Sequence, residues 1–171
     1  MTHSFQPTIL REYDIRGVVG DTLHAADAYA IGRSFATLIA RAGGRSIAVG
    51  YDGRLSSPML EEALVSGIND AGIHALRIGM GPTPMLYYAA STQDVDGGIE
   101  ITGSHNPADY NGFKMVFQGR PFFGADIQTL GQMAAAGDWD SGQAGSDELD
   151  ILDAYVDRLV EGFAGQGVDG K

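Results

Sequence analysis

Apolar residues along the chain follow two alternating patterns, one with the period of a helix and one typical of buried strands. Between residues 25 and 42 they recur at helical spacing, which predicts an amphipathic helix that ends at Gly43-Gly44. Residues 46–51 form a short apolar run, which predicts a buried strand. The same reasoning predicts helices at 58–71, 82–91 and 149–163, strands at 74–79, 98–101 and 113–118, and a short strand or extended segment at 14–19.

This alternation predicts an α/β domain with a mixed, mostly parallel sheet covered by helices. The connection between strands 98–101 and 113–118 is too short for a helical crossover, so these two strands should pair antiparallel. The end of one and the start of the other then lie at the same edge, where we expect Ser104 and Lys114 to come together. The Asn111-Gly112 pair should turn the chain back.

The segment 52–58 leads from a strand end to a helix N-terminus, a place where anions often bind. Ser57 is expected to cap the helix, with Pro58 at its first position. Because capping accounts for these two residues, the sequence favours no ligand role for Arg54.

Residues 134–146 are rich in Gly, Ala, Ser and Asp, a composition that predicts a linker. We therefore expect a first domain over residues 1–137, a linker over 138–148, and a final helix with a tail over 149–171. The apolar stripe of the final helix consists of Leu149, Leu152, Val156, Leu159 and Phe163.

Composition limits the classes of partner. The chain has 171 residues, of which 44% are hydrophobic and 19% charged, as expected of a globular protein that can bury a core. Its net charge of -11 argues against nucleic acid and anionic membranes, and requires local cations for any anionic ligand. It has no cysteine, which excludes disulfides and fits a cytoplasmic location. Neither a secretory signal nor an apolar run near ~18 residues is present.

The most informative stretch is residues 102–114, Thr-Gly-Ser-His-Asn-Pro-Ala-Asp-Tyr-Asn-Gly-Phe-Lys. Ser104 offers a hydroxyl nucleophile, which needs a neighbour to take its proton or a phosphoryl group already attached. His105 is the one histidine of four beside it, and Lys114 is the one lysine before the C-terminal residue. Lysine, unlike arginine, can give up its proton near neutral pH. An ordinary polar turn would explain Ser-x-Asn-Pro alone, but the whole run is far more specific.

Other motifs do not fit their usual context. Residues 165–170 match the dinucleotide fingerprint Gly-x-Gly-x-x-Gly but follow a helix instead of a strand. Residues 138–142 begin like a calcium loop without its later ligands, and the histidines lack metal-ligand spacing. Ser104 is not in a Gly-x-Ser-x-Gly elbow, so a hydrolase triad is not expected.

The run 102–114 resembles the phosphoserine loop of the α-D-phosphohexomutase family, the phosphomannomutase/phosphoglucomutase group. The resemblance extends over about residues 9–163 and includes Tyr13-Asp14-Ile15-Arg16 and the segments 52–58, 81–84 and 124–128. It is strongest to domain 1, the N-terminal domain, of the bacterial dual-specificity enzymes. The phosphoglucosamine branch more often carries alanine where Gly103 stands.

The resemblance implies reversible transfer of phosphate between positions 1 and 6 of mannose or glucose phosphates, through a bisphosphorylated sugar. Ser104 would carry the phosphoryl group and bind Mg²⁺ through a phosphoryl oxygen, with glucose 1,6-bisphosphate as activator. The other catalytic residues would be Lys114, Arg16 and His105. The substrate-binding residues would be Tyr13, Arg16, His105, Asn106 and Lys114.

Family members are longer and have four domains, whereas this chain lacks their Asp-rich metal loop, sugar-selecting loop and C-terminal phosphate loop. We therefore expect domain 1 alone, with the helix at 149–163 leading toward an absent domain 2. We also expect a chain that folds without turning over substrate, with sugar phosphates and the remaining domains as its partners. The alternatives are a stand-alone sugar-phosphate binding or regulatory domain and, more weakly, a phosphatase or phosphoserine carrier.

Overall fold

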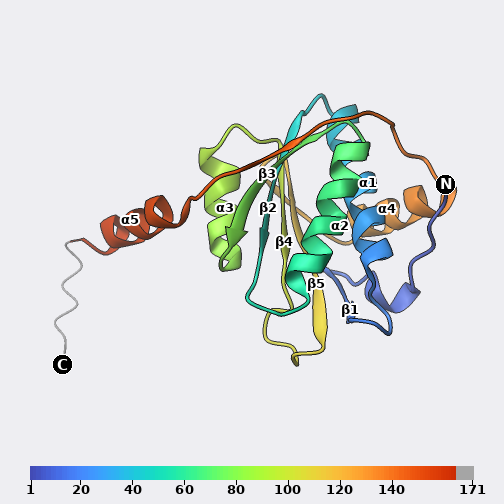
Figure 1. Cartoon of the computed structure of the whole chain (residues 1–171), viewed down its shortest axis with the longest axis horizontal. Helices are drawn as coiled ribbons and strands as arrows, with labels where there is room; N and C mark the ends of the chain where they lie inside the picture. The colour runs from blue at the N-terminus through green and yellow to red at the C-terminus, as the bar shows by residue number, and fades with distance from the viewer. Residues whose placement is uncertain (165–171) are drawn as a thin grey trace.

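A computed structural model describes residues 1–164 as a central sheet with helices on both faces (Figure 1). The strands are β1 (Ile15–Val18), β2 (Ser46–Tyr51), β3 (His74–Met80), β4 (Gly97–Ile101), β5 (Tyr110–Phe117), β6 (Arg120–Phe122) and β7 (Ser146–Glu148). The helices are η1 (Pro7–Ile9), α1 (Ala25–Arg41), α2 (Ser57–Asp70), α3 (Thr83–Thr92), α4 (Ala125–Ala136) and α5 (Leu152–Phe163). None of these is long and apolar enough to cross a membrane. The predicted tail and its dinucleotide-like motif lie outside the described residues.

The strands of residues 1–164 form one mixed sheet in the order β1-β5-β4-β2-β3-β7, with β6 also paired to β5. β2 is parallel to β3 and β4, and β7 is parallel to β3. β5 runs antiparallel to all of its neighbours. This confirms the predicted mostly parallel sheet and the antiparallel pairing of β4 with β5, in which Glu100 lies opposite Lys114.

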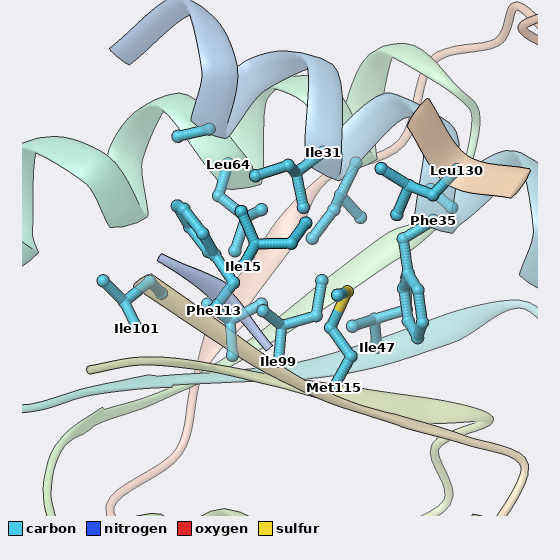
Figure 2. Packing of buried hydrophobic residues seen from close by; sticks show 14 of the residues in the cluster. Ile15, Ile31, Phe35, Ile47, Leu64, Ile99, Ile101, Phe113, Met115 and Leu130 are labelled. Carbon is cyan, nitrogen blue, oxygen red and sulfur yellow. The ribbon is translucent and has the colours of Figure 1, made fainter. Parts of the chain in front are cut away.

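The main core fills the space between the sheet and helices α1, α2 and α4 (Figure 2). Phe113 of the sheet and Ile31 and Leu64 of the helices are fully buried there. Phe35 of α1 packs edge-on against Phe122, with ring centroids 5.2 Å apart. Helix α3 covers the opposite face, where it packs over β2 and β4. On that face, the neighbouring strands β1 and β5 carry two residues of the candidate site, Arg16 and Lys114.

The predicted turn at Asn111-Gly112 is wrong. Both residues lie inside β5, which begins three residues earlier than predicted, and the chain reverses over residues 104–109 instead. Asn111 is fully buried, and its amide donates to the hydroxyl groups of Ser56 and Ser57 at 2.9 Å. These hydrogen bonds to a distant segment hold it in the strand against its local preference for a turn.

Helix α4 and the short strands β6 and β7 were not predicted. β7 lies in the segment 138–148 that was expected to be a linker, and its three residues are all exposed. It pairs with residues 75–77 of β3, so an open strand edge, and not an apolar pattern, accounts for it. The division of the chain into domain, linker and exit helix stays a prediction.

Helix α5 extends away from the body of the molecule (Figure 1). It begins at Leu152, three residues later than predicted, and none of its residues is buried. Its apolar residues are 43–64% exposed, namely Leu152, Val156, Leu159, Val160 and Phe163. Tyr155 touches α3 through Tyr88, with ring centroids 5.9 Å apart. Four residues of the predicted stripe, Leu152, Val156, Leu159 and Phe163, therefore lie on α5 and are largely exposed within residues 1–164. The fifth, Leu149, precedes the helix and packs against a smaller core cluster.

Replacing Phe35 by alanine tests the main core. The ring is fully buried against Phe117 and Phe122, so Phe35→Ala should lower the free energy of unfolding by about 3–5 kcal/mol. Urea denaturation followed by circular dichroism measures this. Leu55→Ala is the control, because Leu55 is fully exposed and its loss should change little. Similar effects of the two substitutions would contradict the packing described here.

Candidate active site

The loop between β4 and β5 presents Ser104 to solvent. Its φ of 53° lies in the left-handed region, which costs a residue with a side chain roughly 1–2 kcal/mol. The backbone N–H of Ser104 donates to the hydroxyl of Thr102 at 2.8 Å. The Ser104 hydroxyl lies 3.2 Å from Nδ1 of His105, within hydrogen-bonding distance. The loop thus holds an exposed hydroxyl in a fixed position beside an imidazole.

The guanidinium of Arg54 holds this loop through hydrogen bonds to its backbone. It donates to four carbonyl oxygens at distances between 2.5 and 3.2 Å, those of Ser104, Asn106 and Pro107 in the loop and that of Tyr110 at the start of β5. It fills the place next to Gly103, where an added Cβ would lie 2.1 Å from Cζ of Arg54. Glycine at this position allows the guanidinium to reach the carbonyl groups.

Asp52 orients Arg54 and the start of the loop. Its carboxylate accepts the N–H of Gly103 at 3.0 Å and the hydroxyl of Ser57 at 2.7 Å. Burial opposes ionisation of Asp52, but hydrogen bonds from Ser57 and from the N–H groups of Arg54 and Gly103 lower its pKa. The prediction that Ser57 caps α2 is wrong, because Ser57 is the first helical residue and its hydroxyl is bound to Asp52.

A second group of charges reaches the loop from β1 and β5. Arg16 is 4% exposed and donates to the carbonyl of Gly103 and, at 2.5 Å, to the carboxylate of Asp14. Nζ of Lys114 lies 3.5 Å from the same carboxylate oxygen. The contacts of residues 1–164 therefore connect Lys114 to the Ser104 loop through Asp14 and Arg16.

The structure brings together residues from three segments of the sequence. Ser104, His105 and Asn106 share the loop, and Arg16 and Lys114 are linked to it as described. Tyr13 is exposed and stacks on Phe123. The sequence did not single out Asp14, Asp52 and Arg54 as members of the site. Of these, only Asp14 lies inside a motif with a predicted site residue, which was a usable signal.

A buried carboxyl group lies on β4, opposite Lys114 in the strand register. Glu100 is 1% exposed, and its Oε1 has no hydrogen-bond partner in the part of the chain that the structure describes. Burial, with a smaller effect of the negative charge on Asp52, raises the pKa of Glu100 to about 8. Glu100 therefore keeps its proton at neutral pH.

An open depression of about 660 Å³ borders the loop. Its lining includes Ser104 and Asn106 of the loop and residues 52–56. Among residues 1–164, no group of three or more His, Cys, Asp or Glu side chains is arranged to hold a metal ion. The arrangement suits a phosphoryl group on Ser104 with cations nearby, because such a group requires positioning and charge neutralisation.

Comparison with known proteins decides the family. Residues 7–140 match the family model described as phosphoglucomutase/phosphomannomutase, alpha/beta/alpha domain I. The chain belongs to the phosphoglucomutase/phosphomannomutase family. It is 46% identical over 153 residues to a phosphomannomutase/phosphoglucomutase of Pseudomonas putida, and the match covers 90% of this chain and 33% of that protein. It is also 46% identical over 159 residues to a phosphoglucomutase of Neisseria gonorrhoeae, and this match covers 89% of this chain and 34% of that protein.

Solved structures agree with this family assignment. A crystal structure of a phosphoglucomutase/phosphomannomutase family protein from Burkholderia thailandensis matches with a TM-score of 0.90 and 42% identity, over 92% of this chain and 36% of that chain. A putative phosphomannomutase from Thermus thermophilus matches with a TM-score of 0.79 at 22% identity, which supports the fold alone. The predicted family and fold are confirmed, and the chain spans about a third of the length of these relatives.

Removing the Arg54 guanidinium tests how the loop is held. Arg54→Met should leave loop carbonyls and Asp52 without their partner and lower the free energy of unfolding by about 2–4 kcal/mol. Urea denaturation measures the change. Arg45→Met is the matched control, because the Arg45 side chain is exposed. Equal stability of the two variants would show that Arg54 does not support the loop.

The buried Glu100 predicts a dependence of stability on pH. Its pKa is about 8 in the folded protein against an ordinary value of 4.5, so the folded form binds the proton more tightly. The stability due to Glu100 is fully present below the ordinary pKa and is lost as pH rises toward the folded pKa. The free energy of unfolding of Glu100→Gln should therefore rise relative to that of the unsubstituted protein as the pH increases. The difference should grow by up to about 1.4 kcal/mol per pH unit between about pH 5 and 8. Urea unfolding across this range measures it, and a pH-independent difference would contradict the burial of an unpaired carboxyl.

Proposed function

We propose that this chain is the phosphoryl-carrying domain of a phosphohexomutase that moves phosphate reversibly between positions 1 and 6 of mannose or glucose phosphates. Ser104 would carry the phosphoryl group, and a bisphosphorylated sugar would be the intermediate. The observation that supports this most is the link from the Ser104 loop through Arg16 and Asp14 to Lys114. The names of the relatives agree with it. Because the chain spans about a third of them, turnover is proposed for a longer assembly.

In the proposed transfer, the bond between phosphorus and Oγ of Ser104 breaks as phosphorus bonds to a sugar hydroxyl oxygen. The sugar hydroxyl loses its proton and Oγ gains one. His105 lies 3.2 Å from Oγ and would exchange that proton. The return transfer reverses each step, with the other phosphate of the bisphosphorylated sugar passing to Oγ. Little else is required of the protein, since phosphoryl transfer depends mainly on positioning and charge.

Arg16 and Lys114 would have different roles in this transfer. Two nitrogens of Arg16 are already bound to Gly103 and Asp14, so Arg16 would act by positioning the loop. The side chain of Lys114 is 30% exposed, and its ammonium would neutralise the phosphate of the substrate. Tyr13 and Asn106 would contact the sugar. A protein with a net charge of -11 depends on such local cations to bind an anion.

Mg²⁺ is part of the proposal, and Ser104 fits it as one ligand. Its side chain is exposed, so a phosphoryl oxygen there is open to an ion. When bound, Mg²⁺ would neutralise charge on the phosphoryl oxygens. Residues 1–164 contain no cluster of metal-binding side chains, so its other ligands would come from the domains that the longer relatives have.

We also propose that the chain alone does not turn over substrate, and that the exposed stripe of α5 packs on the domains that the longer relatives have. An apolar stripe of this size is typical of a surface that another part of a protein covers. A cytoplasmic location stays a prediction, with which the lack of cysteine agrees.

A complementation assay tests the proposed function. The chain is mixed with a fragment of the Pseudomonas putida relative that lacks the matched region, together with Mg²⁺ and glucose 1,6-bisphosphate, and conversion of glucose 1-phosphate is measured. We expect conversion only in the mixture, and a loss of about a thousandfold or more with Ser104→Ala. Ser66→Ala is the control, because Ser66 is exposed on α2 and its hydroxyl donates to the carbonyl of Glu62 in the same helix.

Mass spectrometry of the chain after incubation with glucose 1,6-bisphosphate locates the phosphoryl group, whether or not the chain and the fragment associate. Phosphorylation at Ser104 supports the carrier role. Conversion that persists with Ser104→Ala would overturn it. Binding of glucose 1-phosphate by calorimetry, with no phosphorylation and no conversion in the mixture, would favour a sugar-phosphate binding domain instead.

A further inference from the structure

Two large aromatic side chains are exposed beside the candidate site. Tyr13 is 74% exposed and Phe123 is 47% exposed. Their ring centroids are 6.3 Å apart and their planes differ by 29°, so the two rings stack on each other. Stacking hides only part of each ring, and the pair presents a continuous aromatic surface to solvent, which we call the aromatic platform.

The strand register places the aromatic platform next to Lys114. β1 pairs with β5 as far as Phe113, and β6 pairs with β5 from Met115 onward. Lys114 is the residue of β5 between these two pairings, so the start of β1 and the end of β6 meet at its side. The backbone N–H of Gly124 donates to the carbonyl of Glu12 at 2.6 Å and joins the two ends there.

The sequence neighbours of both aromatic residues are anchored in the structure. Phe122 is 4% exposed and packs into the main core. Phe123 directly follows β6, and its ring does not enter the core but is 47% exposed and stacks on Tyr13. Tyr13 precedes Asp14, whose carboxylate lies 3.5 Å from Nζ of Lys114. The aromatic platform is thus fixed through its backbone while its rings remain accessible.

We propose that the aromatic platform packs against the pyranose ring of a hexose phosphate whose phosphate group lies toward Lys114, and that Phe123 is a specificity-determining contact for that ring. This inference rests on the proposed function and extends it to a residue outside the Ser104 loop. One face of a pyranose ring is lined by C–H groups, which pack on aromatic rings, while its hydroxyl groups stay in water. A half-exposed stacked pair beside a cation fits such a ligand better than a wholly apolar one.

Nuclear magnetic resonance of the isotope-labelled chain tests this, with glucose 1-phosphate and inorganic phosphate as the two probes. We expect inorganic phosphate to shift amide signals of the Ser104 loop only, and glucose 1-phosphate to shift those of Tyr13, Phe123 and Gly124 as well. Phe123→Leu removes the ring and keeps apolar bulk. It should weaken the Kd of glucose 1-phosphate about fivefold and leave that of inorganic phosphate unchanged.

Phe163→Leu is the matched control, because Phe163 is an exposed phenylalanine on α5, and it should change neither Kd. An unchanged Kd of glucose 1-phosphate with Phe123→Leu would overturn the inference, as would equal shifts of the platform by both probes. Loop shifts without platform shifts would overturn this inference alone and leave the carrier role of Ser104 intact. If neither probe shifts the amide signals of the loop or of the aromatic platform, the inference is overturned, and the result also counts against anion binding by this domain.

Discussion

The carbonyl groups of the Ser104 loop point toward two guanidinium groups, and the rest of the candidate site depends on this. Arg54 binds the carbonyls of three loop residues and that of Tyr110 at the start of β5, and Arg16 binds that of Gly103. A loop has no strand partner for these groups, and a carbonyl removed from water without a partner is costly. With the carbonyls satisfied, the loop keeps one conformation, in which Ser104 adopts a left-handed φ and exposes its hydroxyl.

Each arginine is itself oriented by a carboxylate, and one of the two carboxylates also pairs with Lys114. Asp52 binds Arg54, and Asp14 lies between Arg16 and Lys114. The planar guanidinium offers several fixed donors and suits a set of carbonyl groups, whereas an ammonium is a compact charge on a flexible chain. The arginines therefore hold the loop, and the side chain of Lys114 stays partly exposed.

Much of the fold was predictable because each major element carries its own apolar period. The predicted strand 46–51 coincides with β2, and helix 25–42 differs from α1 by one residue. Helix α4 carries such a period in Ile127, Leu130 and Met133, so its sequence held a signal as well. β6 and β7 have three residues each and no such signal, and they form because β5 and β3 present edges to pair with.

The sequence by itself determined the α/β fold, the family resemblance, and the choice of Ser104, His105 and Lys114 as candidate site residues, because these depend on local periods and on one contiguous run. Only the tertiary structure decided that Asp14, Asp52 and Arg54 belong to the site and that Asn111 lies in a strand. Arg54 is 50 positions from Ser104 along the chain, and Asn111 bonds to residues 54 and 55 positions away. An arginine or a buried amide has the same local preferences whatever it faces, so its role depends on which donors and acceptors packing brings to it.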